Sequence, residues 1–341
     1  MFNDVQNSLL PTSFALAIAV PAALGLATTE LPRADLSVMS GTYQRAYEDR
    51  FVDGFPLTEI SREAYTALNL ALFNQTDPEV VIGADDWLFT TEEFRAPSAS
   101  VDFAAEIRAT ADELAQHGIR LVPIIIPDKA RIYADKLPRA RDAELSVRYD
   151  AALDVLATEG FEGLDPATWL TAARAEGATF MRTDTHWSPF GAEQVANRIS
   201  DTLGARGSLN FETQTLAAQD FDGDLMPFVD TGRFAPWVGI PQEHVDLSQT
   251  TKRDDGGLGL FGDEEIGIVL VGTSFSARAE FNFDGALKAA TGFDVVNLAV
   301  EGQGPFAPMS EALADGVLTE IAPQFVIWEI PERYVQPWRL K

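Results

Sequence analysis

Residues 266–276 read IGIVLVGTSFS, an apolar run rich in β-branched side chains that ends at a glycine and three hydroxyl residues. Such a run predicts a strand that is buried on both faces. Three further runs of this kind occupy residues 121–127, 294–300 and 325–330. Helical patterns at 277–290 and 310–321 separate the later runs. The sequence therefore predicts an α/β fold of three layers around a central, mainly parallel sheet.

The end of the strand at 266–272 is the first candidate for chemistry. Sites in folds of this class gather at the carboxyl ends of the strands. Ser274 lies at the turn before a helix, where its hydroxyl is expected to leave the sheet edge and nearby amides can stabilise an oxyanion. A second interpretation stays open, in which Thr273, Ser274 or Ser276 only caps the helix.

A histidine supplies the second candidate. The segment TDTHWSPFG at 183–191 contains one of only three histidines in the chain. Ser188 and Pro189 are typical of a helix start, so a helix is predicted over 189–203, with Asp184 and His186 on the loop before it. Both side chains can then face one cavity, where His186 takes the Ser274 proton and Asp184 fixes the imidazole tautomer. The alternative is a surface histidine beside a solvated aspartate.

Composition excludes several classes of function. The chain has 341 residues and a formal net charge of −27, which argues against a surface that binds nucleic acid. Cysteine is absent, so thiol nucleophiles, disulfides and cysteine-ligated zinc are excluded. The glycine-rich stretch at 256–262 precedes a strand and opens no helix, and no cofactor is expected.

No metal site is predicted either. His117 and His244 have no ligand spacing to His186. The acidic group formed by Asp220, Asp222 and Asp224 lacks the rest of a calcium loop.

The N-terminus indicates export. Residues 5–29 carry no charged side chain, and 14–27 are almost wholly apolar. Residues 1–30 are therefore expected to be a secretory signal peptide or an uncleaved membrane anchor, with a buried first helix as the alternative. Residues 31–341 are expected to form a single domain, with helices at 61–73 and 101–117 and two short strand pieces around a turn at 80–89.

Six motifs together resemble one family. DTHWSPFGA at 184–192, GTSFS at 272–276 and WEIPERY at 328–334 resemble the alginate O-acetyltransferase family, of the AlgJ and AlgX kind. Three more matches follow the order of that family: VIGADDWLF at 81–89, IPDKARIYADKLP at 126–138 and FDGDLMPF at 221–228. The resemblance covers the chain from about residue 51 onward.

The resemblance implies a fold like that of the SGNH hydrolases, with a circularly permuted order in which the histidine motif precedes the serine motif. It implies Ser274 as the nucleophile, His186 as the base and Asp184 as its partner. The implied activity moves an acetyl group through an acetyl-serine intermediate onto hydroxyls of an exported polysaccharide, either alginate or another exopolysaccharide. A periplasmic location and a membrane-bound O-acyltransferase that supplies the acetyl group are also implied. The carbohydrate-binding module of the AlgX kind is expected to be absent.

Further residues are candidates to line the site. Gly302 or Gly304 is expected to offer a second oxyanion amide, although most glycine-rich turns after strands are only turns. Lys129, Arg333 and Tyr334 follow strand ends and are candidates for substrate contact. A surface lysine and a structural salt bridge of Arg333 are the alternatives.

Aromatic side chains and competing activities complete the predictions. Trp87, Trp187 and Trp328 are candidates for a platform on which a sugar stacks, or are simply buried. Two other functions remain open: an esterase or polysaccharide deacetylase, in which water accepts the acyl group, and a non-catalytic polysaccharide-binding subunit of a secretion complex.

Overall fold

The structure is a computed structural model that describes residues 20, 25, 30, 42–55, 57–96, 101–253 and 266–335. The chain divides into two compact units. Residues up to 75 and residues 230–239 form the first unit, and residues 76–229 and 240–341 form the second. Both extended hydrophobic cores of the described residues lie inside the second unit, and the single domain over 31–341 stays a prediction.

The described part of the first unit is helical. Its elements are α3 (Thr42–Gly54), α4 (Thr58–Phe73), the 3₁₀ turn η5 (Gly232–Phe234) and α11 (Ala235–Val238). Arg233 Nε donates to Glu63 Oε2 at 2.6 Å, which ties η5 to α4. The predicted helix at 61–73 is confirmed within α4.

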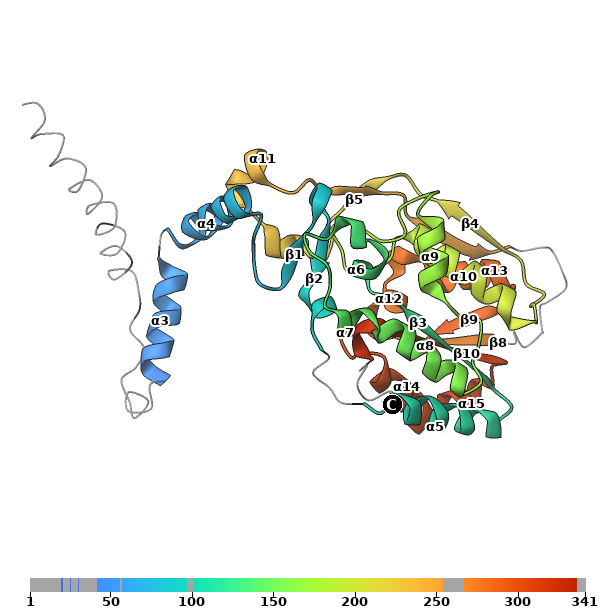
Figure 1. Cartoon of the computed structure of the whole chain (residues 1–341). Coiled ribbons are helices and arrows are strands. Elements are labelled where there is room, and N and C mark those ends of the chain that lie inside the picture. Colours follow the sequence, from blue (N-terminus) through green and yellow to red (C-terminus); the bar gives the residue numbers. More distant parts are fainter. Residues whose placement is uncertain are drawn as a thin grey trace, which may run out of the picture. The chain divides into compact units, whose positions relative to one another are not determined.

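A parallel sheet forms the middle layer of the second unit (Figure 1). Its strands follow the order β3-β10-β8-β9, and all three neighbouring pairs are parallel. The bounds are β3 (Arg120–Ile126), β10 (Phe325–Pro331), β8 (Ile266–Val271) and β9 (Asp294–Asn297). These four strands confirm the predicted mainly parallel sheet.

Alternation along the strands builds a core on each face of the sheet. In β3, Val122, Ile124 and Ile126 face one core, while Leu121 and Ile125 face the other. Side chains of a strand point to opposite faces in turn, so an unbroken apolar run needs cover on both sides. The first core is completed by α9 (Pro166–Ala173), α10 (Pro189–Leu203) and α13 (Phe283–Thr291). The second is completed by α5 (Phe103–Gln116), α8 (Arg148–Thr158), α14 (Phe306–Ala314) and α15 (Val317–Ile321).

Short elements surround these layers. Three antiparallel pairs join β1 (Val80–Ile82) to β2 (Leu88–Thr90), β4 (Phe211–Thr215) to β7 (Ser248–Lys252), and β5 (Gln219–Phe221) to β6 (Glu243–Val245). The short helices are α6 (Lys129–Ile132), α7 (Ala143–Ser146) and α12 (Ser274–Ala277). The 3₁₀ turns are η1 (Ala84–Asp86), η2 (Thr91–Phe94), η3 (Ala134–Lys136), η4 (Met226–Val229), η6 (Ala279–Phe281) and η7 (Glu332–Tyr334). The hairpin of β1 and β2 confirms the strand pieces predicted at 80–89.

Two predicted helices are interrupted. The predicted helix at 277–290 is divided into α12, η6 and α13, because Arg278 is extended and Asn282 is left-handed with φ 50°. The side chain of Asn282 donates to Thr250 Oγ1 at 3.0 Å, and asparagine tolerates this backbone region better than most residues. The predicted helix at 310–321 is broken at Gly316, whose φ is 70°. The predicted strand at 294–300 ends at Asn297.

The predicted N-terminal signal or anchor falls almost wholly outside the described residues, as do residues 256–262. Among the helices of the described ranges, none is both long and apolar enough to span a bilayer.

Candidate active site

The serine turn, residues 272–276, follows β8 without a linker. Thr273 is the N-cap of α12, and its hydroxyl accepts a hydrogen bond from the Phe275 amide at 3.4 Å. Capping is therefore performed by Thr273, which leaves the Ser274 hydroxyl available. Ser274 is half-buried, so a substrate can reach it from solvent.

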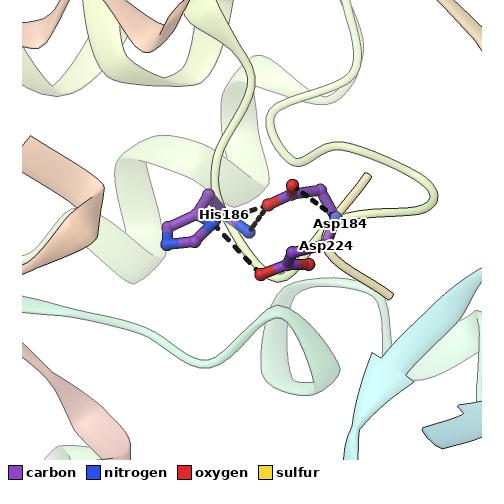
Figure 2. Close-up of side chains that lie close together, drawn as sticks. All are labelled: Asp184, His186 and Asp224. Carbon is purple, nitrogen blue, oxygen red and sulfur yellow. Dashed lines mark hydrogen bonds and ion pairs between the residues drawn. The ribbon is translucent and has the colours of Figure 1, made fainter. Parts of the chain in front are cut away.

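The histidine loop, residues 182–186, brings the proposed base to this hydroxyl. His186 Nε2 lies 2.7 Å from Ser274 Oγ. Its other ring nitrogen, Nδ1, lies 2.5 Å from Asp184 Oδ1 (Figure 2). Asp184 and His186 are both buried, at 0% and 4% exposure. The three residues that the sequence singled out thus form one hydrogen-bonded chain, and their catalytic roles remain a prediction.

Asp184 is held in its ionised form. Its Oδ1 also accepts the His186 amide, and its Oδ2 accepts the Asp224 amide at 2.9 Å and Arg278 Nη1 at 3.1 Å. Burial acts to raise the pKa of Asp184, but the hydrogen bond and charge of His186, the Asp224 amide and Arg278 together hold it well below its ordinary value. A permanent negative charge therefore faces the imidazole, as a stabiliser of its protonated form requires.

Local sequence explains how the loop leads into α10. Ser188 is the N-cap of α10 and accepts the Gly191 amide at 3.0 Å, with Pro189 at the first helical position. The indole Nε1 of Trp187 donates to the Phe275 carbonyl at 3.1 Å. This bond joins the histidine loop directly to the serine turn.

Lys129 supports the histidine loop from inside the protein. Its ammonium group donates to the carbonyls of Arg182 and Asp184, each at 2.9 Å, and to the carbonyl of Leu88. The side chain is 0% exposed, which does not fit the prediction that it lines a substrate surface. Burial lowers the pKa of Lys129 to about 8, with the charge of Glu93 acting in the opposite direction.

Of the other predicted lining residues, Arg333 is the one seen in contact with the serine turn. The Arg333 guanidinium lies 5.5 Å from the centroid of the Phe275 ring, and its Nε is 3.3 Å from Glu92 Oε2. Gly302 and Gly304 are left-handed, with φ of 76° and 70°. A Cβ on Gly304 would lie 3.0 Å from the Tyr334 ring. Within the described residues, none of the four forms a hydrogen bond with the chain from Asp184 to Ser274, so their substrate roles remain predictions.

Sequence reasoning missed two residues of the site, Asp224 and Arg278. Asp224 accepts hydrogen bonds from the Thr185 amide and hydroxyl at 2.8 and 2.5 Å, and its Oδ2 is 3.6 Å from His186 Nδ1. The sequence did contain one signal for Asp224, the preceding Gly223 of the FDGD motif. A Cβ on Gly223 would lie 2.1 Å from the Thr183 carbonyl oxygen, so only glycine lets this segment approach the histidine loop. No local pattern marks Arg278.

The acidic cluster fits proton transfer better than metal binding. Ligand atoms of Asp184, His186 and Asp224 lie within 4.8 Å of one another. Two ligand atoms on one tetrahedral ion are about 3.3 Å apart, whereas the 2.5 Å between His186 Nδ1 and Asp184 Oδ1 is a hydrogen-bond distance. The second oxygen of Asp184 already faces the Arg278 guanidinium, which repels a cation.

The predicted sugar-stacking platform is wrong. Trp187 and Trp328 are 0% and 1% exposed, and Trp87 is 9% exposed. Trp328 donates from its indole nitrogen to the Pro305 carbonyl at 2.8 Å. These rings fill the core, which is the commoner fate of tryptophan.

Comparison with known proteins shows the family to which the chain belongs. Residues 80–332 match the family model described as SGNH hydrolase-like domain, acetyltransferase AlgX. The chain is 36% identical over 318 residues to the probable alginate O-acetylase AlgJ of Pseudomonas syringae pv. tomato, across 89% of this chain and 81% of that protein. The solved O-acetyltransferase domain of Pseudomonas putida AlgJ is similar with a TM-score of 0.67 and 34% identity, over 75% of this chain and 92% of that one. For Pseudomonas aeruginosa AlgX the TM-score is 0.57 at 26% identity, over 77% of this chain and 63% of that one. The chain therefore belongs to the SGNH hydrolase-like acetyltransferase family of AlgX, as the order of its motifs predicted.

Proposed function

We propose that this protein transfers acetyl groups through Ser274 onto hydroxyls of alginate. Ser274 Oγ attacks the carbonyl of an acetyl donor while its proton passes to His186 Nε2. The donor's leaving group departs with that proton, and an acetyl-Ser274 ester remains. A sugar hydroxyl then attacks this ester and gives its proton to His186, which returns it to Ser274 Oγ as the acetylated sugar leaves.

The observation that carries the proposal is the unbroken hydrogen-bonded chain from Asp184 through His186 to Ser274. Asp184 stabilises the imidazolium that forms in both half-reactions. Ser274 is the first residue of α12, so its amide is among the donors that a helix start leaves without an intrahelical acceptor. That amide is suited to bind the developing oxyanion.

The choice of acceptor is supported by the relatives, several of which are named probable alginate O-acetylase. A polyanionic chain approaches a protein of net charge −27 against long-range repulsion. Two cationic side chains, Arg278 and Arg333, lie close to the serine turn, but both are paired with carboxylates of the chain, so a sugar carboxylate must compete for them.

Transfer assays test the activity. The protein is incubated with p-nitrophenyl acetate and alginate oligosaccharides, and acetylated sugar and free acetate are quantified. Acetylated sugar should form, and Ser274→Ala should lose about 10³-fold or more of the rate. Ser200→Ala removes a hydroxyl bonded to the Ala290 carbonyl and is the matched control. Release of acetate alone, at a rate independent of the sugar, would identify an esterase; retained transfer by Ser274→Ala would refute the proposal.

We further propose that the protein works outside the cytoplasm and receives acetyl groups from a membrane-bound O-acyltransferase. The uncharged N-terminal stretch at 5–29 and the absence of cysteine support this location. Fusing residues 1–40 to alkaline phosphatase, which is active only after export, should give an active reporter. An inactive but stable fusion would contradict the proposed location.

A further inference from the structure

A fully buried carboxylate lies directly beneath the serine turn. Glu329 is in the middle of β10, the strand that pairs with β8, and it is 0% exposed. Acidic side chains are almost never buried to this extent without partners, because removing the charge from water is costly. Its partners therefore indicate its role.

Within the described part of the chain, the three donors to this carboxylate all belong to residues that flank the nucleophile. Glu329 Oε2 accepts the Thr273 amide at 2.7 Å, the Thr273 hydroxyl at 3.0 Å and the Ser276 hydroxyl at 3.1 Å. Burial raises the pKa of Glu329, while the bonds from Thr273 and Ser276 favour its ionised form. One oxygen thus fixes the residue before Ser274 and the residue two positions after it.

Gly272 shows how closely the turn is packed on this carboxylate. A Cβ at this position would lie 2.5 Å from Glu329 Oε2, well inside normal contact distance. The glycine of the GTS motif therefore allows the backbone to approach Glu329 closely. This close approach lets the Thr273 amide reach the carboxylate.

We propose that Glu329 is the positioning residue of the nucleophile: it holds the serine turn so that the Ser274 hydroxyl stays in line with His186 Nε2. The inference rests on the proposed role of Ser274 as the acetyl carrier. Without the carboxylate, the buried Thr273 amide and two hydroxyls lose their acceptor, and the turn is free to shift. A displacement of about 1 Å is enough to cost on the order of 10²-fold in rate.

A positioning role predicts that shape and acceptor capacity matter more than charge. In Glu329→Gln the amide oxygen can replace Oε2, and the amide nitrogen can donate to the Thr273 hydroxyl, which lies 3.1 Å from Oε1. Glu329→Leu removes every acceptor at similar size. Glu332→Gln is the matched control, because Glu332 is also fully buried but accepts from the Asp128 amide and Arg131 instead of the serine turn.

The test measures acetylation of Ser274 by p-nitrophenyl acetate in the full chain, with folding checked by circular dichroism. Glu329→Leu should lower kcat by about 10²-fold with KM within about twofold of the native value. Glu329→Gln should stay within about fivefold of the native kcat, and Glu332→Gln should leave kcat of the folded protein unchanged.

Two results would overturn the inference: a folded Glu329→Leu variant with native kcat, or a Glu329→Gln variant as impaired as Glu329→Leu. If Glu329→Leu does not fold, Thr273→Val, which removes one donor at constant shape, should still lower kcat by about tenfold without changing KM. Unchanged kcat in that variant would equally refute it. Failure of the native protein to become acetylated at Ser274 would instead refute the proposed function.

Discussion

The serine turn extends a strand of the sheet, whereas the histidine loop belongs to no helix or strand and is nevertheless buried. The turn is fixed by β8 and by one carboxylate from β10. The loop is held by several separate segments. The amides of Arg182 and Thr183 donate to Glu243 of β6, and that of Thr185 donates to Asp224. The Arg182 carbonyl accepts the Leu88 amide of β2. A buried loop needs partners for its backbone polar groups. Here side chains and backbone amides from other segments of the chain supply them.

This difference separates what the fold determines from what individual polar residues determine. Burial of apolar strands brings the serine turn to the sheet edge, where Glu329 alone supplies the polar contacts of the proposed positioning. The base depends on charged side chains from α6, β6 and the segment before η4. Single polar substitutions should therefore affect the base through several side chains, and the nucleophile mainly through Glu329.

The largest effect is expected from Asp184→Asn. Each oxygen of Asp184 accepts two donors, so an amide group must turn its nitrogen toward one donor set and disturb the histidine tautomer. We expect kcat for acetyl transfer to fall by about 10³- to 10⁴-fold. A folded variant that retains more than a tenth of the native kcat would show that Asp184 does not orient His186.

The next largest effect is expected from Lys129→Met. The carbonyls of Leu88, Arg182 and Asp184 would lose their shared donor, which should cost about 2–4 kcal/mol of unfolding free energy and lower kcat about 10- to 100-fold. Urea unfolding measures the loss of stability, and steady-state kinetics measure the loss of kcat. The control is Lys136→Met, which breaks only the pair with exposed Asp85 and should change stability by less than about 1 kcal/mol. Equal effects of the two variants would refute the special role of Lys129.

A smaller effect, on the pH dependence of the unfolding free energy, is expected from Glu93. Its Oε2 accepts the Ala130 amide at 2.6 Å and so holds α6. Burial raises the pKa of Glu93 to about 7 from an ordinary value of 4.5. The folded state then binds the Glu93 proton more tightly than the unfolded state does. The protonated carboxyl therefore stabilises the fold fully below pH 4.5, and this contribution is lost as pH rises through 7.

Glu93→Gln should remove that pH dependence. Relative to the native protein, its unfolding free energy should rise between pH 5 and 8 by on the order of 2–3 kcal/mol. Urea titrations at several pH values measure this difference. A difference that is constant with pH would contradict the assignment.

Trp187→Phe should have the smallest effect on kcat. It removes the indole bond between the loop and the turn and part of a fully buried ring, but no group of the proposed triad. We expect a loss of about 1–2 kcal/mol in stability and a severalfold lower kcat. Trp237→Phe, at an exposed position of the first unit, is the control and should be neutral. An effect on kcat as large as that of Lys129→Met would show that this single bond governs the alignment of the two segments.

The same contrast explains which features the sequence could predict. The four strands, the α10 start at Ser188 and Pro189, and the place of Ser274 just after β8 follow from local patterns of burial and capping. These patterns involve residues close together in the chain, and the structure agrees with them.

The supports of the loop and the turn could not be predicted in this way. Lys129, Asp224 and Glu329 act on residues 39 to 56 positions away, and nothing in their own neighbourhoods reveals those partners. Arg278 was read as part of a continuous helix, whereas its extended backbone carries a side chain that reaches Asp184. Tertiary contacts override local propensity at such positions.

The most direct test of the account is to trap the acyl-enzyme. The native protein is mixed with p-nitrophenyl acetate without acceptor, quenched in acid, digested and analysed by mass spectrometry. One acetyl group should be found on Ser274, and it should disappear when alginate oligosaccharides are added before the quench. Acetyl found only on other residues, or on Ser274 equally in His186→Ala, would contradict the central role of this serine and its histidine.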